Sequence, residues 1–172
     1  SEVSFYYADG IGGSGSDFTA FVQEALTGID KKHFGAEFGI EFQVTPSIKL
    51  KSAGNFGQYT YINNPLLSLT SEIEDFVFDP RPSNLKNYKL ATGPQQAYSI
   101  GFEYRDPEYW WIGGTVNFFN DAYIDINPLT RTSNFLNNNG VPFNDYDSKI
   151  AKQLLQQEKI APYTVVNLIG GK

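Results

Sequence analysis

The sequence has 172 residues, a formal net charge of −6 at pH 7, 16% aromatic residues, and neither cysteine nor methionine. The lack of cysteine excludes a disulfide scaffold and thiolate metal sites. The negative charge and the scattered lysines argue against a nucleic-acid partner, because a phosphate-binding face needs clustered Lys and Arg. No stretch approaches ~18 consecutive apolar residues, so the sequence contains no candidate transmembrane helix. Without an initiator methionine or a signal peptide, we expect a fragment of a longer chain.

The N-terminal segment carries weak local signals. Residues 1–8 are typical of the end of a strand or an ordered loop, and residues 9–16 are dense in glycine and serine, which indicates a flexible loop. In residues 17–29, Asp17 would suit the N-cap of a short helix, yet apolar residues also alternate there. We favour a strand or an extended segment for 17–29.

The next segment predicts an antiparallel hairpin. Apolar residues alternate with glycine and polar residues from Ala36 to Val44 and again from Ile48 to Phe56. A period of two is that of a strand with two unlike faces. With the turn at Thr45-Pro46-Ser47, the sequence predicts strands at 33–45 and 47–60.

Two acidic residues of this hairpin, Glu37 and Glu41, lie on one face of the predicted strand. Paired carboxylates suggest a glycosidase, in which their separation decides between retention and inversion. The alternative is an ordinary polar face, with pairing to Lys49 or Lys51 across the strands. We favour the polar face and expect no enzyme, because no further acid or nucleophile motif accompanies the pair. The single histidine, His33, excludes a multi-histidine metal site.

A second hairpin lies at the centre of the chain, where alternation over 96–105 and 109–126 flanks a short turn containing proline. Aromatic residues crowd beside this turn. A transmembrane β-strand needs about 9–11 residues with aromatic girdles at both membrane interfaces. A strand of a soluble sandwich shows the same alternation, so the pattern alone does not separate the two. The turn-side aromatic residues are Tyr104, Tyr109, Trp110 and Trp111.

Two long stretches separate the hairpins from each other and from a last strand at 163–172. The first, 61–94, looks irregular and acidic, without the ligand spacing of a calcium loop. The second, 128–162, contains a predicted short helix from Asp147, a plausible N-cap, to Lys159. Structureless loops of this length are uncommon in compact soluble domains. Alternation of short turns with long loops is the arrangement of outer-membrane barrels.

From these patterns we predict an all-β fold, with about five strands of a larger antiparallel transmembrane β-barrel that form part of a single domain. Three segments then carry a family resemblance: 28–61 with GIEFQVTPSIKL, 93–135 with YSIGFEYRDPEYWWIGGTVNFF, and YTVVNLIGGK at the end. They resemble the late barrel strands of TonB-dependent outer-membrane receptors of the Bacteroidota, of the type with a carboxypeptidase-like regulatory domain.

The resemblance implies a C-terminal part of a barrel of about 22 strands with a plugged lumen. It implies location in the cell outer membrane and import of a bulky ligand. The implied partners are outer-membrane lipid, the rest of the receptor with its plug, the TonB complex through parts outside this stretch, and a surface lipoprotein. No catalytic residue, cofactor, metal or ligand-binding residue is carried over.

In this interpretation Tyr104, Tyr109, Trp110 and Trp111 form the periplasmic girdle, and 61–95 and 127–162 are extracellular loops. The alternative is a soluble all-β carbohydrate-binding module, in which exposed Trp and Tyr side chains form a stacking platform.

Overall fold

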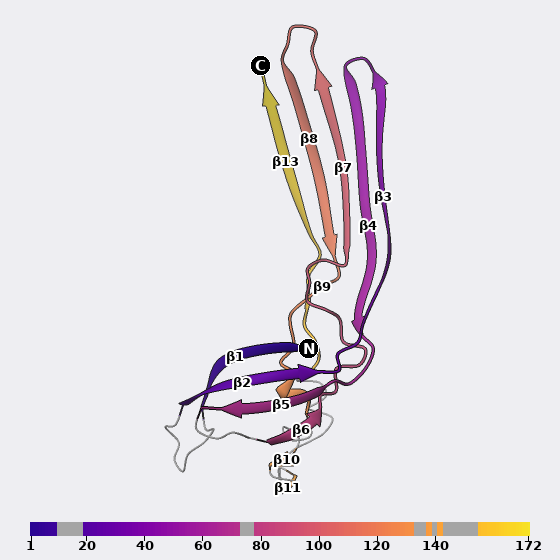
Figure 1. Ribbon diagram of the computed structural model, residues 1–172. Coiled ribbons are helices and arrows are strands. Elements are labelled where there is room, and N and C mark those ends of the chain that lie inside the picture. Colours follow the sequence, from indigo (N-terminus) through magenta and orange to yellow (C-terminus); the bar gives the residue numbers. More distant parts are fainter. Residues whose placement is uncertain (10–18, 73–77, 133–136, 139–140, 143–154) are drawn as a thin grey trace. The chain divides into compact units, whose positions relative to one another are not determined.

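The computed structural model describes residues 1–9, 19–72, 78–132, 137–138, 141–142 and 155–172. These residues form an all-β structure of antiparallel sheets, which confirms the predicted fold class at that level. The only helical element within them is a short 3-10 turn, η1 (Leu129–Arg131). The strands fall into two compact units, which are described separately below (Figure 1).

Unit 2 comprises residues 33–59, 89–125 and 157–172. Its main feature is a five-stranded antiparallel sheet with the strand order β13-β8-β7-β4-β3. The sheet does not close on itself, so β13 and β3 are its two edges. The strands are β3 (Lys31–Thr45), β4 (Ile48–Tyr61), β7 (Gln96–Arg105), β8 (Trp111–Asn120) and β13 (Tyr163–Gly171).

The two hairpins of this sheet have their short turns at the same end (Figure 1). Ile48, the first residue of β4, is paired with Tyr104 near the end of β7. The first residue of β8, Trp111, is paired with Arg105 and also with Gly171 of β13. The register therefore aligns the two turns, and the long connections leave from the opposite ends of the strands.

The predicted strand 109–126 was too long at both ends. Tyr109 has a positive φ of 71° and lies in the turn, so the strand begins at Trp111. At the other end Asp121 has a φ of 56°, and an L-residue with positive φ interrupts the extended backbone. The chain continues as β9 (Ala122–Tyr123), which pairs with β12 (Lys159–Ile160).

Unit 1 comprises the described residues within 1–32, 60–88 and 126–156. It contains an antiparallel sheet with the order β1-β2-β5-β6. Segment 17–29 is therefore a strand over most of its length, as favoured. The prediction of irregular structure throughout 61–94 was wrong, because two strands lie there. The four strands are β1 (Glu2–Asp9), β2 (Thr19–Thr27), β5 (Leu66–Ser71) and β6 (Phe78–Pro82).

One face of the unit 1 sheet is buried. Its side chains come from alternate positions of β2 and β5, as expected for strands with one face in a core. Loop side chains of the unit are buried as well, among them Ser83, whose Oγ donates to the Pro128 carbonyl at 2.6 Å. The buried apolar side chains of this unit include Ala20, Val22, Leu26, Leu67, Leu69 and Leu85, all at most 3% exposed.

Two other predictions concern segments that the structure describes only in part. Residues 10–16 of the predicted glycine-rich loop lie outside the described residues, as do residues 147–154 of the predicted helix. Residues 155–159 of the predicted helix are described and are not helical, and Lys159 belongs to β12. The short strands β10 (Asn137–Asn138) and β11 (Val141–Pro142) pair with each other. None of the described helical residues forms a segment long and apolar enough to cross a membrane.

Candidate functional site

The five-stranded sheet of unit 2 has one apolar face that is exposed. Because side chains alternate and the strands are in register, every second residue of each strand contributes to this face. Many of its large side chains are between 37% and 73% exposed, whereas Tyr98 and Tyr104 are half-buried. The exposed ones include Phe38, Ile40, Phe42, Val44, Ile48, Leu50, Phe56, Ile100, Phe102, Ile112, Val116, Phe118, Val166 and Leu168.

This exposure sets the two units apart. Among the described residues of unit 2, the buried hydrophobic side chains are those of Leu90 and Ala122, and both lie outside the five strands. Soluble monomers rarely expose contiguous apolar patches larger than a few hundred Å², and larger patches mark protein or membrane contacts. The apolar face is therefore the surface of unit 2 that most needs a partner.

The opposite face carries polar, charged and small side chains on β3, β4 and β7. On β8 and β13 it also carries the large side chains of Trp111, Phe119, Tyr163, Val165 and Ile169. Toward the short turns, Lys49 Nζ lies 2.7 Å from Glu41 Oε1 across the β3–β4 hairpin. Glu103 pairs with Lys51 at 3.1 Å and with Arg105 at 2.6 Å. The Lys49–Glu41 pair is the expected cross-strand contact, Lys51–Glu103 is a second cross-strand pair, and Arg105–Glu103 lies within β7.

The two acidic residues considered for catalysis have separate partners. Glu41 forms the pair with Lys49, whereas Glu37 Oε1 accepts a hydrogen bond from Asn55 Nδ2 at 2.9 Å. Each contact is typical of an ordinary polar sheet face. The ring of His33 lies against Tyr59, with centroids 4.9 Å apart.

The four predicted girdle residues all lie at the short-turn end, but on two different faces. Tyr104 and Trp110 are in contact, with ring centroids 5.2 Å apart, and the Tyr104 hydroxyl donates to Asp106 Oδ2 at 2.8 Å. Tyr109 is 88% exposed in the turn. Trp111 lies on the opposite face from Tyr104, next to Gly171.

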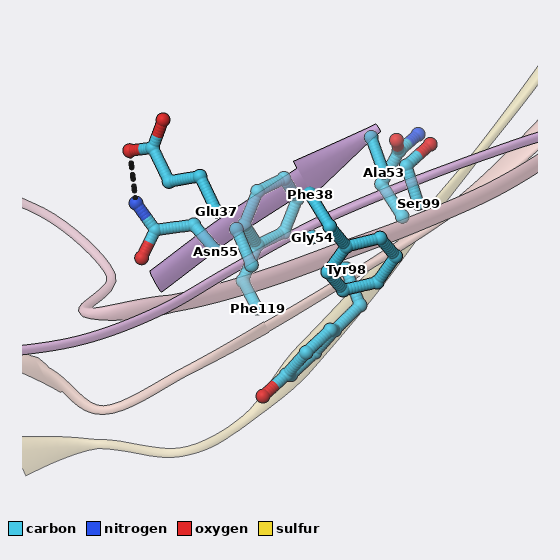
Figure 2. A pocket seen from close by; sticks show the side chains of 10 residues that line it. Glu37, Phe38, Ala53, Gly54, Asn55, Tyr98, Ser99 and Phe119 are labelled. Carbon is cyan, nitrogen blue, oxygen red and sulfur yellow. Dashed lines mark hydrogen bonds between the residues drawn. The ribbon is translucent and has the colours of Figure 1, made fainter. Parts of the chain in front are cut away.

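A depression of about 340 Å³ lies farther from the turns, mainly on the polar face (Figure 2). Its floor is made by small residues of β4 and β7, and its walls come from β3, β4 and β8. Sequence reasoning missed this site, because its members meet only through the register of four strands. Its polar and aromatic side chains are Glu37, Phe38, Asn55, Tyr98, Ser99, Asn117 and Phe119.

Unit 1 contains a buried acidic residue of its own. Glu24 is 5% exposed and accepts a hydrogen bond from the Tyr6 hydroxyl at 3.0 Å. Burial raises the pKa of Glu24, and the Tyr6 hydrogen bond opposes part of that rise. Burial and the nearby Glu24 carboxylate also raise the pKa of Tyr6. The sequence offered no signal for this pair, because the two residues come from different strands.

In the part of the chain that the structure describes, no group of three or more His, Cys, Asp or Glu residues is placed to hold a metal ion. No protein-family model, curated protein or solved structure matches the chain. The two faces of the unit 2 sheet therefore carry the functional argument.

Proposed function

We propose that unit 2 supplies strands to a transmembrane β-barrel, as part of a TonB-dependent outer-membrane receptor that imports a bulky ligand. One observation carries the proposal: a five-stranded sheet without a core of its own exposes an apolar face, while its opposite face is polar along β3, β4 and β7. Barrels in membranes have this distribution, with apolar side chains toward lipid and polar ones toward the interior.

Strand length supports the same function. A strand tilted in a bilayer needs about 9–11 residues to cross it. The strands β7, β8 and β13 have 10, 10 and 9 residues, and β4 and β3 are longer, at 14 and 15. Each is long enough to cross, and both hairpin turns lie at one end, as in outer-membrane barrels.

The open edges of the sheet call for further strands. No described strand pairs with the outer edge of β3 or of β13. Unpaired backbone groups are not tolerated in contact with lipid, because each group without a hydrogen-bond partner raises the free energy of the folded protein by roughly several kcal/mol. In this proposal the remainder of the receptor supplies those strands.

The family resemblance of the sequence supports the remaining parts of the proposal. A plug and a TonB complex act through parts of the receptor outside this chain, and segments 61–95 and 127–162 lie on the extracellular side, where a surface lipoprotein would dock. Tyr104, Tyr109, Trp110 and Trp111 lie at the periplasmic interface. Tyr104 and Trp110, which are in contact beside a short turn, support this role, because short turns face the periplasm in such barrels. Trp111 lies at the same end of the sheet but on the opposite face, so only its position along the strand supports the role.

The alternative of a soluble carbohydrate-binding module receives less support. A stacking platform needs aromatic rings on one surface. Trp110 lies with Tyr104, whereas Trp111 lies on the opposite face of the sheet. These side chains therefore do not form one platform.

The test uses two neighbouring residues of β8 that lie on opposite faces, Val116 and Asn117. Since the chain contains no cysteine, Val116→Cys and Asn117→Cys each create a single site for a nitroxide spin label. In lipid vesicles we expect the label at position 116 to collide mainly with dissolved oxygen, which concentrates in lipid. The label at 117 should collide mainly with a water-soluble nickel complex. Equal access of the nickel complex to both labels, in a protein that is monomeric without detergent, would overturn the proposal.

A further inference from the structure

The depression on the polar face of unit 2 is rich in hydrogen-bond acceptors. Glu37 contributes a carboxylate, whose two oxygens accept hydrogen bonds and donate none. The Asn117 amide nitrogen donates to Thr115 Oγ1 at 3.3 Å and to the Val165 carbonyl at 3.4 Å, so its oxygen remains available as an acceptor. Ser99 adds a hydroxyl group.

Asn55 adds an acceptor that lacks a donor. Its amide nitrogen is directed to Glu37, which fixes the orientation of the amide, and Figure 2 shows the oxygen turned away from that contact. Asn55 Oδ1 is buried and accepts no hydrogen bond from the described residues. A buried acceptor without a donor costs free energy, so such an atom commonly marks a missing partner.

The negative charge of Glu37 is also left without a nearby lysine. The two lysines on the same face of β4, Lys49 and Lys51, are engaged by Glu41 and Glu103. An aromatic wall completes the site, because Phe119 lines the depression and stacks on Tyr163 with ring centroids 5.0 Å apart. A cation gains attraction from an aromatic ring as well as from a carboxylate.

From this inventory we infer that the depression is a binding subsite for an organic cation, a primary ammonium or guanidinium group. Such groups have several donors and no acceptor, which complements the carboxylate of Glu37 and the amide oxygens of Asn55 and Asn117, while their apolar part suits the apolar lining of the depression. An anion would be repelled by Glu37, and an apolar group would leave the acceptors unsatisfied. The cation belongs either to a free amine or to a Lys or Arg side chain of a polypeptide. The inference rests on the proposed function in one respect: the polar face of unit 2 must be turned toward the barrel interior and not toward lipid.

The experiment titrates the detergent-solubilised protein with cadaverine, a free amine, and with N-acetyl-lysine amide, a model of a lysine side chain. Butanol serves as the neutral probe and butyrate as the anionic probe. By calorimetry we expect saturable binding of the two cations alone, weakened by salt as for any partly exposed charge pair. Tighter binding of cadaverine supports a free amine, and tighter binding of the lysine amide supports a polypeptide side chain.

Two matched variants of β3 locate the site. Glu37→Gln keeps an oxygen for Asn55 but removes the charge, so affinity for both cations should fall by about tenfold or more, since hydrogen bonds to charged groups are the stronger ones. Glu41→Gln changes a carboxylate on the same face outside the depression and should alter affinity less than about twofold.

Absence of saturable binding by the folded wild type, equal binding of butanol, or equal losses in the two variants would overturn the inference. A protein that binds amines through Glu37 but is soluble and monomeric would contradict only the membrane proposal.

Discussion

The side chain of Gln95 forms hydrogen bonds with backbone groups, as a neighbouring strand would. It is 2% exposed, and its oxygen accepts from the Tyr59 amide at 3.0 Å. Its amide nitrogen donates to the carbonyls of Tyr59 at 3.1 Å and Leu90 at 3.3 Å. A buried backbone group must find a partner, and here one glutamine satisfies three of them.

We therefore expect Gln95→Ala to be among the more damaging single substitutions in unit 2. Removal of the side chain takes this partner from the Tyr59 N–H and the Leu90 carbonyl, at about 1–3 kcal/mol for each group that stays buried, whereas the Tyr59 carbonyl keeps a hydrogen bond from the Leu90 N–H at 3.0 Å. Urea-induced unfolding in detergent measures the loss. The neighbouring Gln96→Ala serves as the control, because Gln96 binds the side chain of Asp121 rather than backbone. Equal midpoints for the two variants would contradict this account.

The buried Glu24 makes the stability of unit 1 depend on pH. Its folded-state pKa is raised above the usual value, which the unfolded chain retains. The folded state therefore holds this proton more tightly than the unfolded state does. This contribution to the stability of unit 1 is fully present below the pKa of Glu24 in the unfolded chain, about 4.3. It is lost as the pH rises through the higher folded pKa.

We expect Glu24→Gln to remove this part of the pH dependence, because a neutral amide has no proton to lose. Hydrogen exchange of the β2 amides, corrected for intrinsic rates across the pH range, reports the local stability of the sheet. Tyr6→Phe should shift the wild-type profile to higher pH, since the Tyr6 hydrogen bond lowers the pKa of Glu24. A Glu24→Gln profile that still follows the wild type would assign the dependence to other groups.

At the scale of the element, two glycines of β3 differ in the space that surrounds them. A Cβ at Gly35 would lie 2.6 Å from the Phe56 carbonyl oxygen and 3.0 Å from Gly57 Cα, so backbone atoms of β4 would have to move. A Cβ at Gly39 would meet nothing within 4 Å. Close backbone approach is a reason for glycine within a strand.

Gly35→Ala should thus destabilise the β3–β4 hairpin by about 1–3 kcal/mol, the usual cost of overpacking. Gly39→Ala should be neutral or slightly stabilising, because alanine restricts the unfolded chain. The two variants add the same methyl group to the same strand, so the difference between their urea midpoints isolates the contact with β4. If Gly39→Ala costs as much as Gly35→Ala, the β3–β4 spacing is not the cause.

Alternation alone was sufficient to predict the long strands of unit 2. β7 spans the residues predicted for it, because Tyr98, Ile100 and Phe102 alternate with small or polar residues over its length. The same rule overlooked β5, whose six residues, LLSLTS, are too few for a clear period. Alternation also extended the predicted strand beyond Asn120, because an alternation pattern does not reveal the positive φ of Asp121.

The candidate sites depended on information that a pattern in one strand does not contain. The polarity of the face bearing Glu37 could be predicted from β3 alone. Its contact with Asn55, 18 residues away, required the register of the β3–β4 hairpin. Asn117 and Phe119 joined the depression only through the pairing of β7 with β8. Residue types were thus predictable, whereas their combination was not.

At the scale of the whole molecule, the two units obtain their stability from different sources. The unit 1 sheet buries one face around Val22 and Leu69. The unit 2 sheet leaves its apolar side chains exposed, so its own hydrogen bonds are not accompanied by apolar burial within the described residues. Apolar burial is the dominant favourable term in folding. Unit 2 therefore needs an apolar environment that unit 1 does not.

This difference predicts unequal responses to the loss of lipid. In bilayers, amides of both sheets should be strongly protected from hydrogen exchange. After transfer to buffer with detergent below its micelle concentration, amides of β7 and β8 should exchange at least about a hundredfold faster, because nothing then covers the apolar face. Amides of β2 and β5 should change by less than about threefold, since their core lies within unit 1. The β2 and β5 amides act as an internal control in the same sample, so a global loss of structure is recognised at once. Full retention of protection in β7 and β8, in a monomer without lipid or detergent, would mean that unit 2 is stable in water and is no part of a membrane barrel.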